Sequence, residues 1–241
     1  MKESFTESLR CPFCAAARLT LRIGAADERE VREGELACAA CGRTFPIEGG
    51  IADFLDRDDP VLASEVSGWI QLAGPLDDSL VTVMAALPYF PHDPWPEVAP
   101  DFFQIFERLD LRGLRVVDIG AGRTWSTRHL AAIGRAAEVV AVDVLTTRFL
   151  GLATADQFLA QDGIHFERLR GDIHRLPLRD GWADVVFSCA AVHHSSRLDA
   201  LFPEVFRVLK PGGRFVFVSE PAKKDSVPGN RPHNLRTGVI V

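Results

Sequence analysis

The sequence predicts an α/β protein in which a parallel sheet, with helices on both faces, follows a small N-terminal β unit. Three observations lead to this prediction. From residue 114 onward, short apolar runs alternate with helical stretches, a pattern typical of parallel sheets. The stretch VVDIGAG, residues 116–122, joins a strand-like run to a glycine turn. Near the N-terminus, two C-x₂-C pairs are separated by 23 residues.

The composition limits the class of protein. The chain has 241 residues, 47% hydrophobic and 25% charged, which suits a globular protein that buries its core without disulfides. A formal charge of −6 disfavours nucleic acid as a partner, although a local basic patch is compatible with it. The chain contains no apolar run of about 18 residues and no signal-peptide core, so we expect a cytoplasmic protein without a membrane span.

Residues 1–55 are expected to form one β unit, made of two short hairpins with a cysteine pair at each tip. Thiols stay reduced in the cytoplasm, so paired cysteines indicate a metal rather than disulfides. Four thiolates complete the tetrahedral shell of zinc, which makes the expected zinc ribbon structural and not catalytic. The alternative is a cysteine-rich hairpin without metal. The candidate zinc ligands are Cys11, Cys14, Cys38 and Cys41.

Residues 56–110 are expected to form a helical linker or cap, with helices over 61–74, 79–87 and 101–111. Five prolines in LPYFPHDPWPEVAP interrupt regular structure between the last two. His92 and Asp93 are polar candidates in that loop. The segment is rich in aromatic residues, which either roof an acceptor pocket or, as we prefer, pack between the two units. These residues are Trp69, Tyr89, Phe90, Trp95, Phe102 and Phe103.

Residues 111–241 carry the predicted parallel sheet. Only 20 residues follow the last predicted parallel strand, enough for one further strand at 235–241 but not for a hairpin. Either the chain is truncated there or the sheet closes differently, and a missing edge strand would leave the last strand exposed. The expected strands are 114–120, 138–144, 165–172, 183–192 and 214–221, and the expected helices are 124–134 and 198–210.

The glycine turn favours a nucleotide-like cofactor. Gly120 and Gly122 let the backbone turn sharply and approach a ligand, and amides at the following helix start can receive an anion. Asp143 ends the second strand, 25 positions after Asp118, where a carboxylate can accept hydrogen bonds from both hydroxyls of a ribose. A dinucleotide site needs a small residue at the position of Trp125, so NAD is disfavoured.

Four stretches over residues 114–221 occur in the order typical of one family. They resemble a class I S-adenosylmethionine-dependent methyltransferase (methyltransferase type 11-like), which has a Rossmann-like sheet. The N-terminal unit is similar to the zinc ribbon related to the activator subunit of tRNA methyltransferases, notably in CGRTFPIEGGIADFL. The four stretches are VVDIGAG, EVVAVD, GDIHRLPLRDGWADVVFSCAAVHH and EVFRVLKPGGRFVFVSEP.

The resemblance implies S-adenosylmethionine as the cofactor and assigns roles to individual residues. Asp143 would hold the ribose hydroxyls, Asp172 the adenine amino group, and Asp118 would lie near the amino group of the methionine part. Gly120 and Gly122 would pass beside that part. The full implied cofactor set is Asp118, Gly120, Ala121, Gly122, Thr124, Asp143, Val144, Asp172, Ile173, Ser188 and Cys189.

Two features of this set leave alternatives open. Thr124 replaces the third glycine of the family, and its hydroxyl either caps the next helix or touches the cofactor carboxylate. Ser188 and Cys189 would face the methionine end, followed by the catalytic candidates His193 and His194. Either histidine could take a proton from an acceptor, but we prefer the interpretation that both merely fill space at the strand end.

The sequence therefore predicts a methyltransferase that acts on a small molecule. The first alternative is a ribosomal or transfer RNA base methyltransferase, which the acidic pI disfavours. A basic face formed by Arg10, Arg18, Arg22 and Arg43 would favour it. The second alternative is an inactive cofactor-binding scaffold that acts through a partner, for which the short C-terminus is the main support. The acceptor atom and the oligomeric state stay open.

Overall fold

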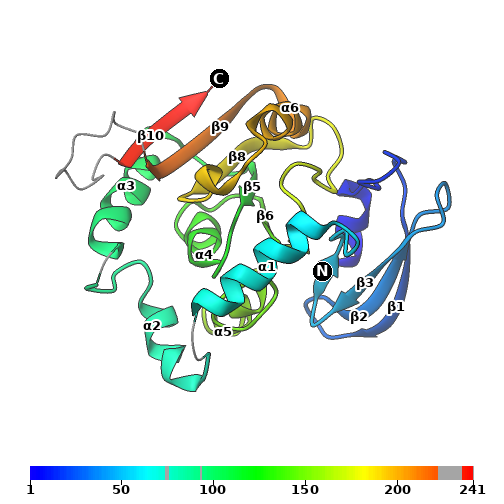
Figure 1. Cartoon of the computed structure of the whole chain (residues 1–241), viewed down its shortest axis with the longest axis horizontal. Helices are drawn as coiled ribbons and strands as arrows, with labels where there is room; N and C mark the ends of the chain where they lie inside the picture. Colours follow the sequence, from blue (N-terminus) through cyan, green and yellow to red (C-terminus); the bar gives the residue numbers. More distant parts are fainter. Residues whose placement is uncertain (74–75, 93, 222–234, 241) are drawn as a thin grey trace.

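The computed structural model describes residues 1–73, 76–92, 94–221 and 235–240. Their strands form one sheet in the order β1-β2-β3-β4-β7-β6-β5-β8-β9-β10. The six strands from β4 to β9 in this order are parallel, and the strands at both ends pair antiparallel. Figure 1 shows β1–β3 and β9–β10 at opposite ends of the molecule. The predicted α/β class is confirmed.

The central strands occur where the sequence predicts them. Strand β5 lies between β6 and β8, so the direction of the sheet order reverses beside β5. In open parallel sheets, the carboxyl ends of the strands at such a switch point form a binding crevice. The bounds are β5 Arg115–Ile119, β6 Glu138–Asp143, β7 Glu167–Arg170, β8 Ala183–Cys189 and β9 Leu209–Pro221.

Both faces of the sheet are covered. Successive strand residues point to opposite faces, so Val116 and Val117 of β5 enter two different apolar clusters. One cluster includes Leu201 of α6 and much of the ribbon; the other contains residues of α3, α4 and α5. Helix α5 has only six residues and was not predicted from the sequence. The bounds are α4 Trp125–Ala132, α5 Asp156–Gln161 and α6 Leu198–Val208.

The N-terminal ribbon consists of β1 (Thr20–Ala26), β2 (Val31–Ala37), β3 (Thr44–Glu48) and β4 (Ile51–Asp53). Only one cysteine pair lies at a hairpin tip as predicted, namely the pair between β2 and β3; the other lies in a turn before β1. The short strand β4 pairs in parallel with β7. The ribbon therefore extends the central sheet and shares its apolar cluster, as expected for a unit too small for its own core.

A buried ion network lies where the ribbon meets the sheet. Arg168 of β7 is fully buried and donates to Glu30 (2.6 Å) and to the carbonyl of Gly49 (3.0 Å). Its other terminal nitrogen donates to Asp156 of α5 at 2.8 Å. Glu30 also accepts from Arg32 at 2.6 Å. Buried charges need such partners, so this network ties the ribbon to the sheet and to α5.

The linker is helical, as predicted, with α1 (Pro60–Ala73), α2 (Val81–Ala86) and α3 (Trp95–Arg108). Helix α3 begins six residues earlier than predicted, because Pro96 falls in the first turn, where a backbone N–H has no helical partner. Pro100 removes one helical hydrogen bond further along. Phe102 of α3 is fully buried, but its ring contacts lie in α3, α4 and β8, so it packs against the central sheet and not between the sheet and the ribbon as predicted. Within the described residues, no helix is long and apolar enough to cross a membrane.

The chain ends with β10 (Leu235–Ile240), which pairs antiparallel with β9. The predicted single C-terminal strand is thus confirmed. Residues 222–234 and 241 lie outside the described part of the chain. Strand β10 covers the outer edge of β9, so the last parallel strand is not the edge of the described sheet.

Candidate cofactor site and metal centre

A cavity of about 310 Å³, called the central cavity below, opens at the carboxyl ends of β5, β6 and β8. Its floor is the glycine loop between β5 and α4. Helices α1 and α3 contribute apolar and aromatic side chains from the linker. The lining residues from the linker are Leu62, Glu65, Trp69, Pro94, Trp95 and Val98. Of the aromatic residues considered for the roof, Trp69 and Trp95 line this cavity. The polar candidate Asp93 lies outside the described residues.

The glycine loop needs glycine at its first position. Gly120 has a φ of +68°, a left-handed conformation that other residues adopt with strain. Its amide donates to the carbonyl of Val142 at 2.9 Å. A Cβ atom built on Gly120 would lie 2.4 Å from the Cβ of Ala191, in the segment after β8. The loop and that segment are therefore in close contact beneath the cavity.

We expect Gly120→Ala to lower the free energy of unfolding by about 2 kcal/mol more than Gly122→Ala. Both glycines have positive φ, so both substitutions introduce backbone strain. Only the Cβ at position 120 meets another atom; a Cβ on Gly122 has no neighbour within 4 Å. Urea unfolding of the two variants tests this. Equal losses would contradict the contact with Ala191.

Asp143 connects β6 to the glycine loop. One oxygen accepts from the Gly122 amide and the other from the Leu145 amide, both at 2.8 Å. Burial raises the pKa of Asp143 to about 6, and these amides partly oppose the increase. A carboxylate has about four acceptor positions, so two remain for donors in the cavity, which Asp143 lines. In this position, Asp143 can accept hydrogen bonds from the two hydroxyls of a ribose.

Asp172 lies at the adjacent wall, in a hydrogen-bonded chain that the sequence analysis missed. Its Oδ1 accepts from the backbone amide of His174 at 2.8 Å and lies 2.6 Å from Nδ1 of that ring. Nε2 of His174 lies 2.7 Å from the hydroxyl of Ser195. Burial opposes ionisation of Asp172, but the bonds to His174 outweigh it and lower its pKa. Ile173 lines the same wall. The D-x-H spacing of Asp172 and His174 is the signal in the sequence that could have indicated this contact.

Asp118 lies beneath the cavity, without lining it. It is fully buried, and one of its oxygens accepts from Ser126 (2.7 Å) and Thr127 (2.6 Å). The other oxygen, Oδ1, is buried without a hydrogen-bond partner in the described structure. Burial raises the pKa of Asp118 to about 7. An orphaned acceptor beside the glycine loop suits the donor group of a ligand, so the residues present fit the predicted cofactor.

These two aspartates should make the ligand-free protein less stable as the pH rises. Their pKa values increase from 3.8 to about 7 and about 6 on folding, so the folded state binds more protons between these values. Stability from such groups is present at about pH 4 and is lost as the pH rises toward about 7. We expect Asp118→Asn, which keeps the shape but cannot ionise, to flatten this dependence. An unchanged slope of unfolding free energy against pH would contradict the assignment.

The structure separates the other predicted cofactor residues. Ala121, Gly122, Val144 and Cys189 line the cavity, whereas Thr124 and Ser188 are buried outside its lining. The prediction that the Thr124 hydroxyl caps α4 is wrong, because it donates to the carbonyl of Arg123 at 2.7 Å instead. Thr124 has a φ of +59°, which explains why glycine is favourable at this position.

Of the two candidate catalytic histidines, only His194 lines the central cavity. Its ring packs edge-on against Trp69 of α1, with 5.0 Å between centroids. Desolvation and the neighbouring His193 lower its pKa, so it is neutral and able to accept a proton near neutral pH. His193 is instead bound to Glu220 through Nδ1 at 2.8 Å. Glu220 also accepts from the amide of Ala191 at 2.9 Å and thereby anchors this segment.

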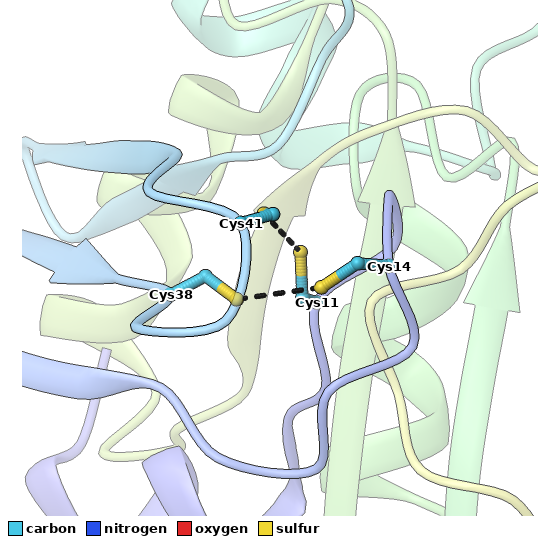
Figure 2. A group of neighbouring side chains, drawn as sticks. All are labelled: Cys11, Cys14, Cys38 and Cys41. Atoms are coloured by element: carbon cyan, nitrogen blue, oxygen red, sulfur yellow. Dashed lines mark hydrogen bonds between the residues drawn. The ribbon is translucent and has the colours of Figure 1, made fainter.

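The four predicted metal ligands come together at the ribbon. Their sulfur atoms all lie within 4.8 Å of one another, and Figure 2 shows the two pairs facing each other from two turns. The turns match: the amides of Cys11 and Cys38 donate to Ala16 and Arg43, both at 2.9 Å. The sulfur atoms of Cys14 and Cys38 are 3.5 Å apart and those of Cys11 and Cys41 are 3.7 Å apart, close to the ~3.8 Å that tetrahedral Zn–S bonds of about 2.3 Å require. The set fits structural zinc.

We expect zinc-replete protein to carry one zinc ion per chain, and Cys38→Ala to lose it, because three thiolates leave the tetrahedral shell incomplete. Cys189→Ala is the matched control, since Cys189 lies in the central cavity and not in the cluster. Elemental analysis after gel filtration measures the content. Full zinc in Cys38→Ala, or none in the parent protein, would contradict the metal site.

The fold and site together define a parallel-sheet protein with a nucleotide-type cofactor cavity at the switch point. Family models identify the domains: residues 117–217 match the methyltransferase domain and residues 2–50 match the Trm112p-like protein. The chain therefore combines a methyltransferase domain of the S-adenosylmethionine-dependent class with an N-terminal Trm112p-like domain, as the sequence analysis predicted.

Several known proteins are similar to this chain. A malonyl-[acyl-carrier protein] O-methyltransferase of Methylovorus sp. (strain MP688) is 35% identical over 120 residues, 47% of this chain and 40% of that protein. A fatty-acid O-methyltransferase of Mycolicibacterium smegmatis is 30% identical over 49% of this chain and 41% of its own. A solved SAM-dependent methyltransferase from Aquifex aeolicus is 22% identical, with a TM-score of 0.47 over 66% of this chain and 80% of that one. The chain thus spans less than half the length of these two curated relatives.

Proposed function

We propose that this protein transfers a methyl group from S-adenosylmethionine to a small-molecule acceptor bound in the central cavity. The observation that carries the proposal is Asp143, a buried carboxylate that is bonded to the glycine-loop amide of Gly122 and lines the cavity with acceptor positions to spare. The methyltransferase domain match over residues 117–217 contains both residues.

The protein's part in this chemistry is to bind, orient and exclude water. The cofactor, when bound, supplies a methyl group on a positively charged sulfur, which is already an electrophile. Asp143 would receive the ribose hydroxyls and Asp172 the adenine amino group, and Asp118, which is buried outside the cavity lining, would lie near the amino group of the methionine part. The apolar side chains of Leu62 and Trp69 would keep water from the reacting atoms.

A carboxylic acid is the acceptor class that we propose. Two of the curated relatives are named for the O-methylation of an acyl-carrier-bound malonyl group and of a fatty acid. A carboxylate is ionised at neutral pH, so it can attack the methyl group without a general base. His194 would then serve to shape the cavity beside Trp69, and it would act as a base only for a protonated acceptor.

The RNA alternative receives less support from the ribbon. Of the arginines that could form a basic face, Arg10 is paired with Asp180 at 2.8 Å and Arg22 with Glu35 at 3.4 Å. The guanidinium of Arg43 lies over the ring of Phe13. The scaffold alternative is distinguished from the enzyme by methyl transfer itself, because both bind the cofactor.

The test is transfer of radiolabelled methyl groups from S-adenosylmethionine to a panel of acceptors: free and carrier-bound carboxylic acids, and transfer RNA transcripts. We expect label in base-labile esters of the acids and none in RNA. Asp143→Ala is the inactive control. Label in RNA alone would replace the proposal with the RNA alternative, and cofactor binding without any transfer would favour the scaffold.

A further inference from the structure

Arg123 is a cation without a charged partner in the central cavity. It follows Gly122 in the glycine loop and, within the described residues, is the only lysine or arginine that lines the cavity. Its Nε donates to the carbonyl of Phe149 at 2.8 Å, and no described carboxylate lies within ion-pairing distance. Burial alone lowers its pKa. A partly buried guanidinium normally has an anionic partner, so its side chain is incompletely satisfied in the ligand-free protein.

The position of Arg123 indicates which part of a ligand it meets. The preceding residue, Gly122, donates to Asp143, which is the proposed ribose site. Arg123 therefore lies one residue from the ribose, to which the amino-acid part of S-adenosylmethionine is attached. The bond from Nε to the carbonyl of Phe149 fixes one side of the guanidinium and leaves its terminal nitrogens without a hydrogen-bond partner among the described residues. Those nitrogens form the fork that matches a carboxylate.

The charges around the cavity agree with this position. Among the described residues, three other carboxylate, lysine or arginine side chains line it, and all are acids: Glu65, Asp143 and Asp172. The cofactor carries one carboxylate together with an amino group and a sulfonium, so its carboxylate is the group that the acids repel. Arg123 is the side chain that can receive it.

We propose that Arg123 binds the carboxylate of the amino-acid part of the methyl donor. The inference rests on the proposed function, since it concerns the same cavity. It makes Arg123 a binding residue that distinguishes ligands with an amino-acid carboxylate from those without one. In the sequence, Arg123 lies in the glycine-loop stretch GAGRTW, between the second glycine and Thr124.

The test compares two ligands that share the adenosine part. S-adenosylhomocysteine has the carboxylate, and 5′-methylthioadenosine lacks the amino-acid part. Isothermal titration of the zinc-replete full chain should show that Arg123→Met lowers the affinity for S-adenosylhomocysteine at least tenfold. The affinity for 5′-methylthioadenosine should change less than about twofold. Arg123→Lys should recover part of the loss. Arg148→Met is the control, because Arg148 is an exposed arginine near Phe149 that pairs with Asp78.

The outcomes separate this inference from the proposed function. If Arg123→Met lowers the affinity for both ligands equally or for neither, the assignment of Arg123 is wrong, whereas the adenosine site stands. If the parent protein binds neither ligand, the proposed function itself fails. A loss in Arg148→Met equal to that in Arg123→Met would attribute the effect to net charge and overturn the inference.

Discussion

Replacing Asp143 by alanine lowers the affinity for S-adenosylmethionine at least about 100-fold, because the ribose hydroxyls lose a charged acceptor worth about 1.5–3 kcal/mol per bond. In the parent protein the Gly122 amide donates to Asp143 at 2.8 Å, so the same substitution leaves this amide unpaired and loosens the loop beneath the cofactor. Isothermal titration with the cofactor and its demethylated product measures both effects, and the two ligands should lose affinity alike.

Asp162→Ala provides the matched control for Asp143→Ala. Asp162 is also an acid beside the same half of the sheet, but it pairs with Arg128 at 2.6 Å and does not line the cavity. Its loss should leave cofactor affinity within about twofold. Asp143→Ala protein that is folded and binds as tightly as the parent would place the cofactor elsewhere.

Arg168→Met should lower the free energy of unfolding by about 1.5–3 kcal/mol, because Glu30 and Asp156 lose a charged hydrogen-bond donor. The loss stays in this range because the ammonium group of Met1 and Arg32 still pair with Glu30. Methionine fills much of the space of the arginine stem, so the loss reports the ion network rather than a cavity. The substitution should also weaken the attachment of β4 to β7, because Arg168 of β7 pairs with Ile51 of β4. Urea unfolding at constant zinc measures the change.

Arg115→Met controls for the loss of one arginine from a central strand. Arg115 of β5 pairs with Glu138 at 2.9 Å, but both side chains are exposed, and such pairs contribute about 1 kcal/mol or less. A loss below about 1 kcal/mol in Arg168→Met would contradict the stabilising role assigned to Arg168 between the ribbon and the sheet.

The central strands could be predicted because their sequences are almost purely apolar. EVVAVD and ADVVFSC are typical of buried parallel strands, and they are the sequences of β6 and β8. The glycine loop and Asp143 could be predicted for a related reason, since a sharp turn and a strand-end acid are local features. The position of the four cysteines at one centre followed from the number of ligands that zinc needs.

Other features depend on contacts between distant residues, which no local pattern reports. Strand β4 has three residues, and its partner in β7 lies more than a hundred positions away. Arg168 looks like a solvated charge in HFERLRGD, yet it is fully buried because Glu30 and Asp156 reach it. Likewise, the chain from Asp172 through His174 to Ser195 joins two segments that only the fold brings together.

Thr124 illustrates how a local rule can mislead. A threonine directly before a helix is a common cap, and the sequence supports that role. A cap residue needs extended backbone, however, and the turn from Gly122 holds Thr124 at a positive φ of 59°. Its hydroxyl therefore points back to the carbonyl of Arg123 instead of to an amide of the first turn.

The most direct test of the central claim is a crystal structure of the zinc-loaded protein with S-adenosylhomocysteine. The account predicts the ligand in the central cavity, with its ribose hydroxyls on Asp143 and its adenine beside Asp172 and Ile173. A ligand bound elsewhere, or an empty cavity at saturating ligand, would contradict the claim that this chain holds the methyl donor at the switch point of its sheet.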